Sequence, residues 1–326
     1  MSWLKKLDAW LFGKTGPEAL GVLRIVIGAL ATLNLVLFGL AYKHFYTDYG
    51  LMPKEVSDRY LYYPSEIVFE GTPLFFQLPF APQRISFYNL IAEPWWPPTL
   101  YCITILAAIC MTIGFKTRIA TWVVVAGMVS FHLRTPLVIH GGDTLLRLTV
   151  IYLALSRCGN VYSLDWLLAK EKMHKERIWA LPQRLIQVQL MVCYLNTVLW
   201  KFQGSNWRNG TATWYPPNLK EFERFPVPDF MMQQPMVMIT TYGTLIVELS
   251  LATLINYKPL RRTVIICGLL LHGYIEYAYN IPFFSYVITA GYFAFYDSEE
   301  IRAFVDRLKA RFRKVGPQTV QPTEAA

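Results

Sequence analysis

The chain has 326 residues, of which 54% are hydrophobic and only 16% are charged, and its formal net charge is +9. A soluble domain carries roughly 25% charged residues, so this composition excludes an ordinary soluble protein and favours an all-α bundle of transmembrane helices in the lipid bilayer. The positive charge does not indicate nucleic-acid binding, because no basic stretch alternates with aromatic residues in a soluble module.

Eight apolar segments follow one another along the chain, most of them near the length of a bilayer span. They lie at residues 21–42, 97–115, 117–133, 144–159, 183–200, 236–256, 263–279 and 283–297. Most of the 31 lysine and arginine residues fall at the two ends of the chain and in every second loop, as the positive-inside rule requires of cytoplasmic segments. The pattern predicts about eight crossings with both termini cytoplasmic, and we expect a multi-pass protein of the bacterial inner membrane.

Two segments outside the apolar runs are typical of the membrane surface. Residues 299–315 alternate apolar and basic side chains at helical spacing, which predicts a helix on the anionic inner leaflet. The outer loop from Lys43 to Trp96 is rich in aromatic residues and proline, which favour the membrane–water boundary. The five cysteines lack metal-ligand spacing, so we expect no metal site. We expect one domain over residues 1–315 and a polar tail at 316–326.

Several ionisable residues lie well inside the apolar segments, where they are costly unless they have polar partners. The ones that we expect to form a network are Arg24, Arg147, Glu248 and His272. We expect a buried polar network in which Glu248 pairs with one of the other three, and the sequence does not choose among them. A clamp between helices is the structural alternative. Asp143 lies four residues before Arg147, so these two side chains share a helix face and can pair.

Further polar residues gather where the predicted helices meet the outer surface. They are His132, Arg134, His140, Asp143, Lys201 and Trp207. Polar groups at one membrane depth suggest a binding or catalytic site. The alternative is that the outer ends of helices are simply where polar residues belong.

The helix predicted at 183–200 carries polar residues at spacings of three and four. One face holds Gln189, Cys193, Asn196 and Trp200. This spacing predicts that the face looks into the bundle. Tyr194, Thr197 and Lys201 lie on a neighbouring face, and a ligand pocket at the outer mouth of the bundle follows as a hypothesis.

Several short motifs follow one another along the chain, and their order is characteristic. They are LRIVIG at 23–28, DYGLMP at 48–53, GFKTR at 114–118, SFHLRTPLV at 130–138, HGGD at 140–143, LLR at 145–147 and KFQG at 201–204, followed by Trp207, the stretch 210–212, His272 and the stretch 284–286. In this set the chain resembles the horizontally transferred transmembrane (HTTM) domain family, which includes the membrane portion of vitamin K-dependent γ-carboxylases.

The resemblance implies an enzyme that oxidises reduced vitamin K or menaquinol with oxygen and uses the base so formed to carboxylate glutamate. It also implies that Lys201, at the matching motif, is the catalytic base, with the other outer polar residues around substrate and cofactor. A poorly hydrated aromatic pocket would disfavour the ammonium form of this lysine, and only the free amine is a base. The alternative for the lysine is an interfacial side chain that extends to water.

Two other functions compete with the enzyme. The carboxylases carry a large lumenal region that binds their substrate protein, and no such region follows the last apolar segment here. A non-catalytic membrane partner that assists export or maturation of another protein is therefore the main alternative. A transporter is less favoured, because the sequence shows no inverted repeat and no broken-helix signature.

Overall fold

The computed structural model describes residues 3–47, 50, 51, 53, 55, 56, 86–89, 95–135, 138–169 and 177–315. In this part of the chain the fold is a bundle of helices, with a single two-stranded antiparallel sheet that pairs β1 (Lys14–Thr15) with β2 (Ile178–Trp179). Most of the outer loop, two residues of the 130–138 motif and the predicted polar tail at 316–326 lie outside the described residues.

A helix coincides with each of the eight apolar segments. They are α2 (Glu18–Leu40), α5 (Trp96–Ile113), α6 (Thr117–Arg134), α7 (Gly141–Ala154), α9 (Leu181–Gln203), α11 (Gln234–Thr253), α12 (Lys258–Ala278), and α13 (Phe284–Ala290) continued by η8 (Gly291–Phe295). Four of these helices, α2, α5, α9 and α11, are long and apolar enough to cross a membrane. The expected helical membrane protein is thus confirmed, whereas the count of eight crossings and the side on which each terminus lies stay predictions.

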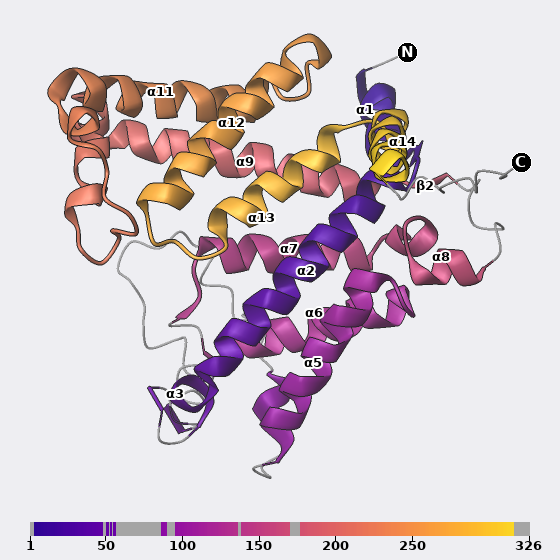
Figure 1. The fold of residues 1–326 in the computed structure, drawn as a ribbon. Coiled ribbons are helices and arrows are strands. Elements are labelled where there is room, and N and C mark those ends of the chain that lie inside the picture. The colour runs from indigo at the N-terminus through magenta and orange to yellow at the C-terminus, as the bar shows by residue number, and fades with distance from the viewer. Residues whose placement is uncertain are drawn as a thin grey trace, which may run out of the picture.

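Shorter elements complete the described chain. They are α1 (Trp3–Phe12), α3 (Tyr42–Tyr46), η2 (Phe87–Asn89), η4 (Cys158–Asn160), α8 (Leu164–Leu168), α10 (Ser205–Arg208), η5 (Ala212–Trp214), η6 (Pro216–Asn218), η7 (Asp229–Met232) and α14 (Ser298–Val315). The helix predicted at 299–315 is present as α14. Its Arg302 forms an ion pair with Glu18 at the start of α2, so α14 lies at the same end of the molecule as α1 (Figure 1).

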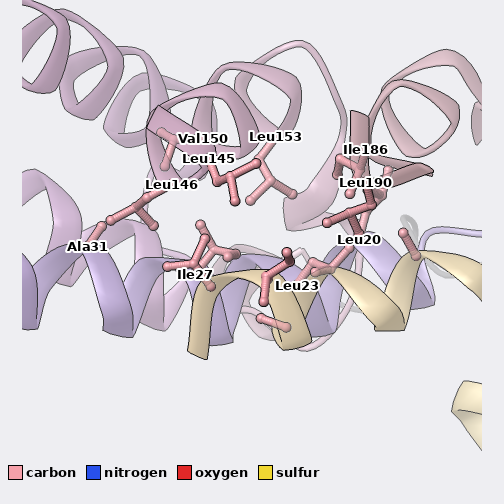
Figure 2. Close-up of a cluster of buried hydrophobic side chains, with 14 of the residues drawn as sticks. Leu20, Leu23, Ile27, Ala31, Leu145, Leu146, Val150, Leu153, Ile186 and Leu190 are labelled. Atoms are coloured by element: carbon pink, nitrogen blue, oxygen red, sulfur yellow. The ribbon is translucent and has the colours of Figure 1, made fainter. Parts of the chain in front are cut away.

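Helix α2 lies between α5 and α6 on one side and α9, α11, α12 and α13 on the other, and α7 crosses it (Figure 1). Its buried face repeats at the spacing of a helix and contacts both groups. Figure 2 shows Leu20, Leu23, Ile27 and Ala31 of α2 beside Leu146 and Val150 of α7 and Ile186 and Leu190 of α9. In a bilayer such contacts stabilise mainly through van der Waals packing, since lipid is as apolar as the core.

Glycines allow close contacts between helices in this bundle. A Cβ placed on Gly28 of α2 would lie 2.7 Å from the Thr112 Oγ1 of α5, so the two backbones approach each other at the glycine. Gly114 ends α5 with a φ of +76°, a left-handed conformation that glycine adopts without steric cost. This glycine turns the chain directly into α6.

The face of α9 that looks into the bundle differs from the one expected. Trp200 is 65% exposed and Asn196 is exposed, so the prediction was wrong for these two residues, whereas Gln189 and Cys193 of the same face are half-buried. The buried stripe instead includes Leu190, Tyr194 and Val198. The spacing gives the angles between side chains on one helix, but the neighbouring helices decide which face is covered.

Candidate functional site

A cavity of about 860 Å³ lies between α9, α11, α12, the start of α13 and the segment 207–231 that connects α9 to α11. Side chains from every one of these elements line it, and most of them are apolar. The polar exceptions include Lys201 and Glu248, with Tyr194 and His272 deeper in the wall. The cavity therefore has a polar wall and an apolar body.

Lys201 and Glu248 form an ion pair in this wall, from Lys201 Nζ to Glu248 Oε1. Side chains on a helix lean toward its N-terminus. Lys201 near the C-terminus of α9 accordingly leans back toward Thr197, while Glu248 leans toward the beginning of α11, and the two groups meet. Thr197 Oγ1 donates a second hydrogen bond to Glu248 Oε2 over 3.3 Å.

Little solvent reaches this pair. The side chain of Lys201 is 22% exposed and that of Glu248 is 8% exposed. The ring of Trp207, from α10, covers the ammonium group at 5.0 Å from Nζ to the ring centroid, a cation–π contact. A buried ion pair of this kind is costly to break by removing one member, because the remaining charge is stranded.

A chain of hydrogen bonds lies next to the pair. The Tyr194 hydroxyl of α9 is 2.8 Å from His272 Nε2 of α12 and 2.6 Å from the Tyr292 hydroxyl of η8. The other ring nitrogen of His272, Nδ1, is buried and has no hydrogen-bond partner among the described residues. Buried polar atoms normally have partners, so this nitrogen is available to a bound molecule or to water.

The cavity also reaches an apolar part of the molecular surface. Ile239 of α11 and Leu270 of α12 both line it, and they are 63% and 70% exposed. Of the two helices, α11 is long and apolar enough to cross a membrane. The cavity therefore opens onto exposed apolar side chains.

A second polar group lies at the beginning of α7, outside the lining of this cavity. Asp143 Oδ2 accepts a hydrogen bond from the backbone N–H of His140 over 3.1 Å, and His140 Nδ1 accepts one from the N–H of Gly142 over 2.9 Å. Asn34 of α2 donates to Asp143 Oδ1 over 3.0 Å. These bonds form a capping box that closes the N-terminus of α7 and ties it to α2.

His132 and Arg134 are buried at the end of α6. Both ring nitrogens of His132 lack a hydrogen-bond partner among the residues that the structure describes. Phe284 lies between the cavity wall and the polar group at the beginning of α7. The Phe284 ring is 5.7 Å from the ring of His272, and a Cβ placed on Gly142 would lie 3.0 Å from the Phe284 Cα.

The expected outer site thus divides into two parts. Lys201 and Trp207 belong to the cavity, whereas His132, Arg134, His140 and Asp143 do not line it.

The expected buried network is wrong in its pairing. Glu248 pairs with Lys201 and not with Arg24, Arg147 or His272. Arg24 instead donates to the carbonyl oxygens of Met111, Thr112 and Tyr162, at 2.6 to 2.7 Å. Two of these carbonyls belong to the last turn of α5, where helix geometry leaves such groups without partners. The arginine therefore needs no carboxylate.

The pairing expected between Asp143 and Arg147 does not occur either. Asp143 accepts from Asn34 and His140, and no ion pair joins it to Arg147 within the described part of the chain. Glu276, one turn after His272, pairs with Arg224 of the covering segment. Two residues of these polar groups, Asn34 and Tyr292, were not expected from the sequence. Asn34 carried a usable signal, because an asparagine in the middle of an apolar helix needs a polar partner.

Comparison with known proteins identifies a family. A family model described as the HTTM domain matches residues 80–299, which include the described residues of α5 to α13 and both polar groups except Asn34. No curated protein and no solved structure matches the chain.

Proposed function

The chain belongs to the HTTM domain family, and on that premise we propose that it is a membrane enzyme that oxidises a lipid-soluble quinol, with Lys201 as the base. The observation that carries the proposal is the Lys201–Glu248 pair in the wall of a largely apolar cavity that reaches the lipid surface. Titratable groups in a mostly apolar pocket are the usual signature of a ligand or active site.

The cavity fits an amphipathic ligand. Its volume of about 860 Å³ lies toward the upper end of the range of small-molecule pockets, roughly 300–1,000 Å³. The polar wall suits the hydroxyls of a quinol ring, and the rest suits an apolar tail. His272 Nδ1, buried and without a partner among the described residues, offers a further hydrogen bond to such a ring.

The chain's own groups can move the necessary proton. Only the free amine of Lys201 can accept a proton, so the proton on its ammonium must first pass to Glu248 along their hydrogen bond. Lys201 Nζ then takes the proton of a hydroxyl held beside it, and the ring of Trp207 stabilises the ammonium that re-forms. A bound reduced naphthoquinol such as menaquinol would supply that acidic hydroxyl and the electrons, with dioxygen as the oxidant.

Oxygen consumption and quinone-epoxide formation with reduced menaquinone test this function. The wild type is expected to consume oxygen, while Lys201→Ala and Lys201→Arg are expected to be inactive. Guanidinium stays protonated, so the arginine variant preserves the charge opposite Glu248 but removes the base. Absence of turnover with several quinols, or turnover by Lys201→Arg near the wild-type rate, would sink the proposal.

A non-catalytic membrane partner of another protein is the second candidate, and the same ion pair favours it. A carboxylate in contact with an ammonium group favours the charged form of that group. The charged form suits a clamp between α9 and α11, whereas a base must first lose its proton. The two candidates differ in turnover. A protein that binds quinol without oxidising it would support the second.

A further inference from the structure

Gly243 lies in the middle of α11 and lines the cavity. Glycine weakens the interior of a helix relative to alanine, because it loses the most conformational freedom on folding. A glycine at such a position therefore calls for a physical reason.

Packing against protein does not supply this reason. A Cβ placed on Gly243 would meet no heavy atom within 4 Å. Other glycines of the bundle are needed for close contacts, as at Gly268 of α12, where a Cβ would lie 2.7 Å from the Tyr292 hydroxyl. At Gly243 the missing side chain leaves open space on the cavity side of the helix.

The open space at Gly243 lies between the two ends of the cavity along α11. Ile239, one turn earlier on the same face, stands at the lipid-facing mouth of the cavity, and Glu248 stands at its polar wall. With a rise of about 1.5 Å per residue, Gly243 lies roughly 6 Å from the first and 7.5 Å from the second along the helix axis. An elongated ligand with its head at Glu248 and its tail toward lipid passes Gly243.

We propose that the gap at Gly243 is a binding slot for the apolar tail of the ligand, so that the cavity selects quinones with a polyprenyl chain over the same ring without one. The inference rests on the proposed function for the ring of the ligand, and it adds the tail as the feature that the protein recognises. Gly243 is then a specificity-determining residue that takes no part in proton transfer.

Equilibrium binding in lipid nanodiscs tests the slot with two probes, a naphthoquinone bearing a tetraprenyl chain and the same naphthoquinone without the chain. The variant is Gly243→Leu. Gly273→Leu is the matched control, because Gly273 of α12 also has open space around its Cβ position but does not line the cavity. Binding is measured, so the result does not depend on turnover.

Gly243→Leu is expected to weaken binding of the tailed quinone about tenfold, the effect of removing about two methylene groups from apolar contact. Binding of the tailless quinone should change by less than about twofold, and Gly273→Leu should change neither. If the leucine variant does not fold, Gly243→Ala should give a smaller loss with the same dependence on the tail.

Equal loss for both quinones, or no loss for either, would overturn the slot, as would a wild type that binds neither quinone. A wild type that binds the tailed quinone at Gly243 but never oxidises its reduced form would retain the slot while refuting the proposed chemistry. The two failures are therefore distinguishable.

Discussion

Replacing Lys201 by alanine is expected to lower the free energy of unfolding by about 3 kcal/mol. Removing one member of a buried ion pair typically costs about 3–5 kcal/mol, since the other is left uncompensated. Glu248, 8% exposed, would be that stranded group. It can take up a proton and keep its hydrogen bond from Thr197, so the lower end of the range applies.

A double-mutant cycle in mixed micelles measures this coupling. Lys201→Ala, Glu248→Ala and the double variant are unfolded with a denaturing detergent. The double variant should be less destabilised than the sum of the two single variants, by about 1–3 kcal/mol, because neither charge is then stranded. Additive effects, or a Lys201→Ala variant within about 0.5 kcal/mol of the wild type, would refute the reasoning.

Arg147→Ala is the matched control for this experiment. The position of Arg147 inside an apolar segment suggests that its loss would damage the fold more than the loss of Lys201. The structure reverses that ranking, because Arg147 is only half-buried and has no ion pair to Asp143 among the described residues. A larger loss of stability in Arg147→Ala than in Lys201→Ala would restore the ranking based on the sequence.

Three further predictions follow from the fold and the site. Lys201→Arg should melt within a few degrees of the wild type yet show no quinol-dependent oxygen uptake, because its guanidinium keeps the charge but cannot act as a base. Gly28→Ala should destabilise by about 1–3 kcal/mol in detergent unfolding, since its Cβ would be forced against Thr112; an unchanged stability would contradict the close contact of α2 and α5. Cysteines placed at Ser2 and Ala326 should both be protected from an impermeant reagent in intact cells; labelling of only one would exclude an even number of crossings, and labelling of both would reverse the predicted orientation.

The helices could be predicted from the sequence because their main determinant in a membrane protein is local. A backbone in lipid must satisfy its own hydrogen bonds, so a sufficiently long apolar run is forced to be helical whatever its neighbours are. For this reason the run at 183–200 coincides with α9. The rotation of α9 about its axis is not local, and the expectation that Asn196 and Trp200 look inward failed. Near the end of a span such residues can face headgroups and water at little cost.

The partner of Glu248 could not be predicted for a related reason. Hydropathy identifies Glu248 as a residue that needs a polar contact, but its partner depends on the crossing of α9 and α11. Arg24 was a plausible partner by charge. It is satisfied instead by carbonyl oxygens that the end of α5 leaves unpaired in any case.

Stability and chemistry are coupled at Lys201, and this coupling decides which experiments can identify the function. Of the ion pairs between described residues, Lys201–Glu248 is the one that lines the apolar cavity. The ammonium group of Lys201 holds α9 to α11 through Glu248, and the same group must lose its proton if Lys201 is a base. Lys201→Ala removes the contact and the base together, so lost activity in that variant has two explanations. Lys201→Arg keeps a cation opposite Glu248 and removes only the free amine. Inactivity of a stable arginine variant therefore argues for proton transfer at Lys201, and its activity argues for the clamp.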